Sequence, residues 1–175
     1  MTAIRVLSAV DLLSARAAFN ELLLDAVHGG ASVGFLPPLD AELADKYWLG
    51  VEAAVRMGST ILLGAYDDTR LVGAVQLGLA HQANGTHRAE VMKLMVHSAA
   101  RRQGIGRRLM RAIEEEAATR ERYLLILDTE RESAAETLYR SLGWQTLGII
   151  PRYALSHDRT LRDTVFFFKE LAARP

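Results

Sequence analysis

The segment that most constrains this fold is residues 91–110, where an apolar strand passes through a glycine-containing loop directly into an amphipathic helix. The loop reads Arg101-Arg102-Gln103-Gly104-Ile105-Gly106. Backbone N–H groups at a helix start have no intrahelical partner, and glycine lets the main chain curl so that several of them converge on one anion. The helix dipole and the neighbouring arginines add positive charge. The junction therefore predicts a phosphate-binding site.

Two other interpretations of these glycines stay open. The run from Gly104 to Leu109 is close to the GxGxxG dinucleotide fingerprint, and Asp128 follows at about the spacing of a ribose-binding acid. Against that interpretation, Leu109 replaces the third glycine, and too few strands follow for a doubly wound parallel sheet. The glycines could also serve only a tight turn.

Hydrophobic periodicity and turn signals predict the element order β-α-α-β-β-β-α-β-α-β-β. Ser8, followed by Asp11, and Asp40 are the expected helix N-caps. Strands are expected at about residues 4–7, 60–66, 71–79, 88–96, 123–127, 144–150 and 164–169, and helices at about 8–27, 40–57, 107–120 and 133–142.

The composition narrows the function. The chain has 175 residues, half of them hydrophobic, which is enough for a single domain spanning residues 1–175. Lysine plus arginine equals aspartate plus glutamate at 21 each, so no net charge attracts nucleic acid or an anionic membrane. The absence of cysteine excludes disulfides and a thiolate nucleophile, and the histidines lack ligand spacing, so no metal is expected. No signal peptide or membrane span is recognisable, which favours a cytoplasmic protein.

Two motifs resemble those of the GCN5-related N-acetyltransferases, the GNAT family. The pattern Arg101-x-x-Gly104-x-Gly106 is similar to the family's acetyl-CoA pyrophosphate loop, and the element order is that of the family. Leu138-Tyr139-x-x-Leu142-Gly143-Trp144 is similar to its second motif, with tryptophan in place of phenylalanine. The resemblance covers the chain from about residue 60 to the end. It implies an α/β fold with a central mixed, mostly antiparallel twisted sheet, splayed at the acetyl-CoA site and flanked by helices.

The resemblance also implies how acetyl-CoA, the acetyl donor, would be held. In this family the main chain of the strand before the loop pairs with the pantetheine arm, here at Leu94, Met95 and Val96. Glu132 stands where many relatives carry an asparagine that touches this arm, so Ser133 beside it is the expected contact. The pyrophosphate would lie against the loop and helix start, formed by Arg101, Arg102, Gln103, Gly104, Ile105, Gly106 and Arg107.

The chemistry of acetyl transfer to an amine calls for a base. An alkylammonium with a pKa of about 10.4 is charged at neutral pH and must lose a proton before it attacks. Glu90 and Asp128, on strands either side of the expected splay, could accept that proton directly or through water. Backbone N–H groups near residues 94–96 could stabilise the oxyanion, and Tyr139, by the resemblance, would protonate the departing thiolate.

Each of these residues also has a purely structural explanation. Glu90 could be a solvated strand residue, Asp128 a turn or N-cap residue, and Tyr139 a core residue. Lys93, in the middle of an apolar strand, is expected either to face solvent or to pair with an acid of a neighbouring strand.

A closer resemblance concerns the acceptor. Residues 27–35, 88–96, 127–130 and 151–153 are similar to segments of the tabtoxin-resistance acetyltransferases, which inactivate a β-lactam amino-acid toxin. This implies a small-molecule amine acceptor, with a tabtoxinine-type amino acid as an example and antibiotic resistance as a role. The long loop from His28 to Phe35 would close over it. The implied substrate residues are His28, Gly30, Ser32, Phe35 and Tyr153.

Several alternatives remain at this stage. The long loop could simply link two helices. The acceptor could be another small amine or a protein amine, and the chain could be a non-catalytic acyl-CoA-binding domain. The chain could act as a monomer or a homodimer.

Overall fold

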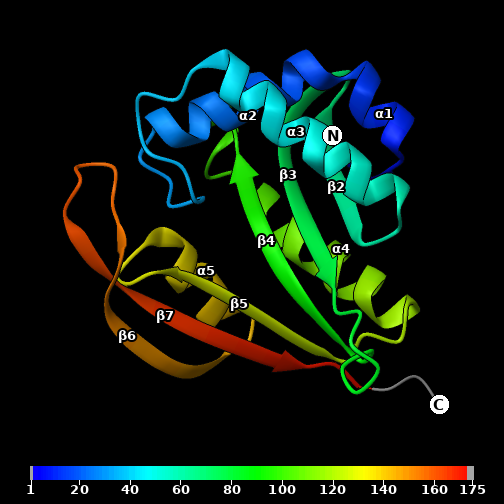
Figure 1. Ribbon diagram of the computed structural model, residues 1–175, viewed down its shortest axis with the longest axis vertical. Helices are drawn as coiled ribbons and strands as arrows, with labels where there is room; N and C mark the ends of the chain where they lie inside the picture. Colours follow the sequence, from blue (N-terminus) through cyan, green and yellow to red (C-terminus); the bar gives the residue numbers. More distant parts are fainter. Residues whose placement is uncertain (1, 173–175) are drawn as a thin grey trace.

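The computed structural model describes residues 2–172 and forms one seven-stranded open sheet in the order β1-β2-β3-β4-β5-β7-β6. The strands are β1 (Ala3–Leu7), β2 (Thr60–Asp67), β3 (Arg70–Leu79), β4 (Arg88–Val96), β5 (Leu124–Glu130), β6 (Gln145–Leu155) and β7 (Leu161–Glu170). The helices are α1 (Ala9–Ser14), α2 (Arg16–His28), α3 (Ala41–Arg56), α4 (Ile105–Thr119) and α5 (Ala134–Ser141), with a short 3₁₀ helix η1 (Ser98–Ala100). Figure 1 shows this arrangement, which follows the predicted element order except that one more helix precedes β2.

Helices α1 and α3 begin where the sequence predicts, whereas α4 begins at Ile105, two residues before the expected Arg107. Ser8 and Asp11 form a capping box at α1, and the side chain of Asp40 accepts a hydrogen bond from Leu43 N at α3. The expected helix over residues 8–27 is instead two helices that meet at Ala15. The Ser14 hydroxyl donates to the Val10 carbonyl one turn earlier, a bond that bends helices.

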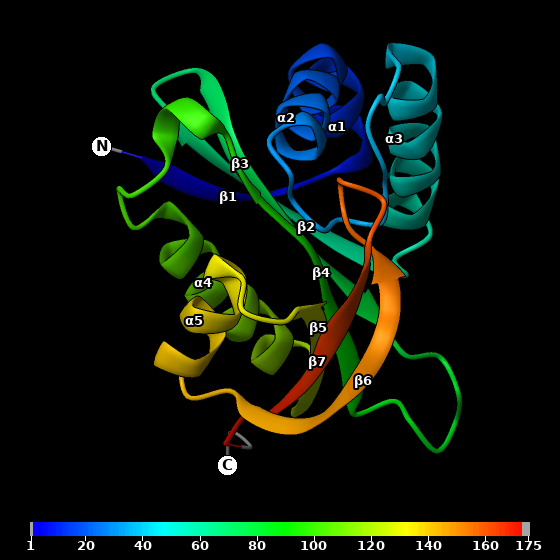
Figure 2. The ribbon, with the colours of Figure 1, turned by 90° about the vertical axis from the view of Figure 1, so that its left-hand side faces the viewer.

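The helices cover the two faces of the sheet unequally. Helices α1, α2 and α3 pack on one face around Phe19 and Trp48, whereas α4 and α5 cover the opposite face. Figure 2 shows the two groups of helices on either side of the sheet. The first group lies over the β1–β4 half, so the same face of β5, β7 and β6 stays open.

The sheet splays in its middle. Every neighbouring pair of strands is antiparallel except β4 and β5, which run parallel. Their register covers only residues 88–90 of β4 and 124–126 of β5, after which the two strands diverge, as Figure 1 shows. This confirms the expected mixed, mostly antiparallel sheet and excludes the doubly wound parallel sheet of a dinucleotide-binding fold.

Strands β5, β6 and β7 are longer than their sequence suggests. β5 continues past residue 127 because its antiparallel pairing with β7 extends as far as Glu130 and Thr164. β6 continues through Pro151, which an edge strand tolerates because its outer side needs no N–H donor. Asp128, which follows the expected strand at residues 123–127, is therefore a residue within β5.

Candidate active site

Glu90 and Asp128 lie on the same face of the sheet, at the point where β4 and β5 separate. Glu90 is opposite Ile126 in the last pair of the parallel register, and Asp128 follows two residues later on β5. Side chains two residues apart on a strand share a face. Their sequence neighbours Ala89, Val91 and Leu127 point into the core under α4 and α5. Both carboxylates therefore face the open side of the splay.

The surroundings raise the pKa of both acids. For Glu90, partial burial is the main cause and the charge of Asp128 adds to it, while Lys93 opposes the shift. For Asp128, burial again raises the pKa and Lys93 lowers it. Lys93 itself is half-buried, and its pKa is lowered by burial against the opposing effect of the two acids. Lys93 is thus partly buried and lies in the electrostatic field of both acids.

Tyr139 combines a core position with proximity to Asp128. Its side chain is only 6% exposed, and its ring packs against Trp144 and Phe167 at centroid distances of 6.2 and 6.1 Å. Burial, and then the charge of Asp128, raises the pKa of its hydroxyl. The group therefore stays protonated at neutral pH, which suits a proton donor.

The second half of β4 has a main-chain edge that β5 does not cover. Leu94, Met95 and Val96 lie beyond the last residue that pairs with β5, while β3 continues to pair with β4 as far as Val96. The side chain of Met95 is buried under α1–α3, and those of Leu94 and Val96 pack toward α4. An extended amide-bearing chain could add to this edge as a further strand.

The start of α4 has the geometry of an anion site. Gly104 occupies the N-cap position with φ +75, no side chain caps the helix, and its first intrahelical bond is Arg108 N–H to the Gly104 carbonyl. The N–H groups of Ile105, Gly106 and Arg107 thus have no helical acceptor. A Cβ on Gly104 would meet nothing within 4 Å, so the space before the helix is open. These features fit the pyrophosphate of acetyl-CoA.

The arginines of this loop point in different directions. The Arg101 Nε donates to the Val96 carbonyl at 3.3 Å, and the Arg107 guanidinium donates to the Ser141 hydroxyl at 2.8 Å. Arg102, with φ +62, and Gln103 are exposed. Upstream of this loop, Asp25 of α2 accepts hydrogen bonds from the backbone N–H and hydroxyl of Ser98 at 2.8 and 2.6 Å. The sequence gives no signal for this contact, which ties the loop to α2.

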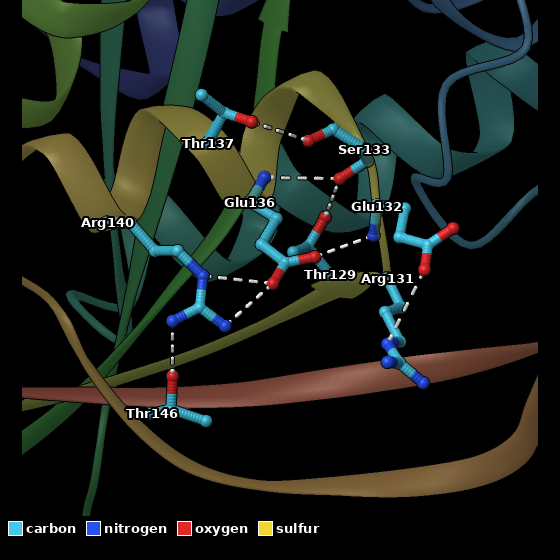
Figure 3. Close-up of polar contacts among 8 residues, drawn as sticks. All are labelled: Thr129, Arg131, Glu132, Ser133, Glu136, Thr137, Arg140 and Thr146. Carbon is cyan, nitrogen blue, oxygen red and sulfur yellow. Dashed lines mark hydrogen bonds and ion pairs between the residues drawn. The ribbon is translucent and has the colours of Figure 1, made fainter.

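Ser133 caps α5, as Figure 3 shows. Its hydroxyl accepts a hydrogen bond from Glu136 N at 3.1 Å and lies 3.3 Å from the Thr129 hydroxyl. The Glu136 carboxylate also accepts from Glu132 N at 2.6 Å and pairs with Arg140. The network fixes the start of α5, so the predicted pantetheine contact of Ser133 would use a hydroxyl that already has two partners.

The long loop between α2 and α3 is folded back on itself. His28 Nε2 accepts a hydrogen bond from Leu39 N at 3.3 Å, which joins the two ends of the loop. Phe35 packs edge-on against Tyr47 of α3, and Ser32 is exposed. His28 thus connects the two ends of the loop, and we call this hydrogen bond to Leu39 the clasp of the loop. The sequence does not indicate this role.

The tip of the β6–β7 hairpin meets this loop. A Cβ on Gly30, which has φ +80, would lie 3.4 Å from the ring of His157. Figure 2 shows the hairpin reaching toward the loop across the open face. On the same hairpin, the half-exposed Tyr153 packs edge-on against Phe166 at 5.3 Å. Gly30 and Tyr153 therefore border the open side of the splay.

A cavity of about 310 Å³ lies beside Glu90. Its volume suits a small molecule, and its walls are mainly apolar with a few polar groups. The lining residues are Gly78, Leu79, Ala80, Gln82, Arg88, Ala89, Glu90 and Ile126.

Two further features bear on the class of protein. Within residues 2–172, no three His, Asp or Glu side chains are grouped so that they could hold a metal ion. In the same part of the chain, no helix combines the length and apolar character that crossing a membrane requires.

The family model described as an acetyltransferase (GNAT) domain matches residues 58–146. The chain belongs to the GNAT acetyltransferase family, whose members use acetyl-CoA as donor.

Solved structures agree with this assignment. A ribosomal-protein-alanine N-acetyltransferase from Brucella melitensis is 27% identical, with 97% of this chain and 99% of that chain covered and a TM-score of 0.79. YncA from Salmonella typhimurium, solved with its cofactor acetyl-CoA, is 20% identical over 100% of this chain and 96% of that chain, with a TM-score of 0.79. An N-acetyltransferase from Staphylococcus aureus Mu50 is 16% identical over 98% and 99%, also with a TM-score of 0.79. The last two comparisons show the fold alone.

Proposed function

We propose that this protein transfers an acetyl group from acetyl-CoA to the amine of a small molecule by direct attack. The observation that carries the proposal is the position of Glu90 and Asp128, which share one face of the sheet where β4 stops pairing with β5. An amine that approaches this face would meet both carboxylates beside the open edge of β4.

The donor site is proposed from the uncovered edge of β4 and the start of α4. The main chain of Leu94, Met95 and Val96 would pair with the pantetheine arm and polarise the thioester carbonyl. The N–H groups of residues 104–107 would hold the pyrophosphate. Bound acetyl-CoA supplies the thioester that carries the acetyl group. The side chains of Arg102 and Gln103 are free to turn toward its phosphates, and Ser133 would flank the arm.

The proton transfers are assigned to three side chains. Glu90 or Asp128 accepts the proton of the incoming ammonium, and the raised pKa makes each, once ionised, a stronger proton acceptor than an exposed carboxylate. Tyr139 keeps its proton at neutral pH and donates it to the departing thiolate.

The acceptor site is proposed from the segments that border the open face. The loop that contains Gly30, Ser32 and Phe35 and the hairpin that carries Tyr153 approach each other at His157, and the cavity beside Glu90 has the volume of a small molecule. This favours a small acceptor, for which a tabtoxinine-type β-lactam amino acid is the specific candidate.

A protein amine is the second candidate. It is favoured by the 27% identity to the ribosomal-protein-alanine N-acetyltransferase from Brucella melitensis. The close approach of His157 to Gly30 across the open face narrows the room for a polypeptide N-terminus.

A panel of acceptors tests the proposal. The protein and acetyl-CoA are incubated with one acceptor at a time: a tabtoxinine-type amino acid, other small amines, or a peptide that begins with alanine. Released CoA thiol is measured, and the products are then identified by mass spectrometry. Acetylation of a small amine supports the proposal. Acetylation of the peptide alone moves the acceptor to protein amines, and acetyl-CoA binding without any transfer overturns the enzymatic assignment.

A further inference from the structure

Strand β4 contains a bulge at Lys93. Ala74 of β3 pairs with Met95, but the next pair joins Gln76 to Met92, so that Lys93 and Leu94 together oppose a single residue of β3. Lys93 has φ +52, a left-handed conformation that is uncommon for a residue with a side chain. Bulges of this kind redirect side chains and occur next to active sites.

The bulge decides on which face Lys93 lies. Ala89 and Val91 are buried in the core under α4, and strict alternation would place residue 93 in that core as well. The extra residue shifts the alternation, so Leu94 packs against this core instead. The Lys93 Nζ lies over the loop after α2, 3.1 Å from where a Cβ on Gly34 would be. A strained backbone that places one charge on the face of two acids points to function.

Charged and titratable groups at the splay influence one another. Lys93 lowers the pKa of Glu90 and of Asp128, and the charge of Asp128 raises the pKa of Tyr139 of α5. Arg88 lines the cavity beside Glu90. Two carboxylates at one site repel each other, and without a cation one of them tends to hold a proton. Lys93 is the cation that lowers the pKa of both.

We propose that Lys93 is a positioning residue whose ammonium, aimed by the bulge, keeps Glu90 and Asp128 ionised so that one of them can accept the proton of the acceptor. This inference rests on the function proposed above. It assigns to Lys93 no contact with the reacting atoms, because Lys93 acts through the two acids.

The direct test measures the two carboxyl groups without any turnover. NMR titration of the Glu90 and Asp128 side-chain carboxyls is compared between the wild type and Lys93→Met, which keeps the length and removes the charge. We expect both apparent pKa values to rise by about one unit in Lys93→Met and to return toward wild type in Lys93→Arg. Unchanged values in Lys93→Met would overturn the proposal. Lys93→Gln serves the same test if the methionine variant does not fold.

The kinetic test uses the pH profile of kcat/KM, which reports the pKa values of the free enzyme. The apparent pKa at which kcat/KM rises on the acid side of the profile, its acid limb, should be higher in Lys93→Met by the shift seen in the titration. The control Lys46→Met on α3 should leave this apparent pKa unchanged. A variant with lower stability but an unmoved limb would show a packing role. If KM rises only for amines that carry a carboxylate and the acid limb is unchanged, Lys93 would instead bind the acceptor's carboxylate. Either result contradicts the proposal. If the wild type acetylates no amine, the proposed function fails, but the titration still tests Lys93.

Discussion

At the scale of single residues, Tyr139 has two roles to separate. Its ring fills the core between Trp144 and Phe167, while its hydroxyl lies in the field of Asp128. A phenylalanine keeps the ring and removes only the proton donor. The substitution therefore distinguishes packing from catalysis.

Tyr139→Phe should lower kcat by roughly one to three decades while leaving acetyl-CoA affinity and the melting temperature nearly unchanged. Thiol-release kinetics, isothermal titration with acetyl-CoA and thermal melting would measure the three quantities. Tyr123→Phe, the same change directly before β5, is the matched control. An equal loss of acetyl-CoA binding in Tyr139→Phe would indicate a packing role.

Ionisation of Asp128 favours activity but lowers the stability of the fold. Because the pKa of Asp128 is raised in the folded protein, ionisation at neutral pH weakens the fold relative to lower pH. The stability from its protonated form is present below the ordinary value of about 3.9 and is lost as pH rises through the folded pKa. Catalysis needs the ionised form, so activity rises over the same range.

Asp128→Asn should therefore lower kcat by roughly two decades or more, yet melt at the same temperature as the wild type or higher at pH 7. Melting curves at pH 4 and pH 7 and a pH–rate profile provide the measurements. The advantage in melting temperature should shrink toward pH 4. A variant that loses stability at pH 7 in proportion to its activity would show that Asp128 is structural.

At the scale of elements, the start of α4 carries the donor site. Gly104 adopts φ +75 in open space, and Gly58, after α3, adopts φ +72 in equally open space. A β-branched residue is strained to a similar degree at both positions. The pair therefore separates backbone strain from ligand binding.

Gly104→Val and Gly58→Val should each destabilise the fold by about 1–2 kcal/mol. Only Gly104→Val should weaken acetyl-CoA binding, by tenfold or more, because its backbone N–H belongs to the proposed phosphate site. Chemical denaturation and isothermal titration give the two values. Equal acetyl-CoA affinity in both variants would contradict the proposal that the start of α4 binds the pyrophosphate.

The elements also show what can be predicted from the sequence. The caps of α1 and α3 were predictable because Ser8 and Asp40 act on backbone groups a few residues away. The length of β5 through Asp128 depends on its pairing with β7, and the bulge at Lys93 depends on the register with β3. Such long-range pairings leave no local pattern, so the face of Lys93 could not be read from its neighbours.

The candidate site was predictable to a similar extent. Glu90 and Asp128 were identified from the chemistry, and the structure places them on one face. The clasp of His28 to Leu39 and the bond of Asp25 to Ser98 join residues far apart in the chain, and no spacing rule indicates them.

At the scale of the whole molecule, the two halves of the sheet must stay connected although β4 and β5 separate. The β4–β5 register joins the two halves of the sheet at one end only. A polar network adds a second connection, because Glu114 of α4 accepts hydrogen bonds from Trp144 Nε1 at 2.9 Å and from Lys169 Nζ of β7 at 2.7 Å. Both members of the ion pair are largely buried, at 14% and 21% exposure.

Glu114→Ala should lower the free energy of unfolding by about 3 kcal/mol, because it leaves the buried Lys169 ammonium without its carboxylate. Glu115→Ala, on the exposed side of the same helix, should change it by less than about 0.5 kcal/mol. Urea denaturation would measure both. Equal and small effects would mean that the network does not hold β7 against α4.

In the proposed mechanism, the two acids at the splay drive acetyl transfer to an amine. The most direct measurement quantifies released CoA thiol and N-acetylated product together, in the wild type and in the double variant Glu90→Gln with Asp128→Asn. We expect one amide per thiol in the wild type, and loss of both in the double variant while acetyl-CoA still binds. Thiol release without amide, or a double variant as active as the wild type, would contradict the account.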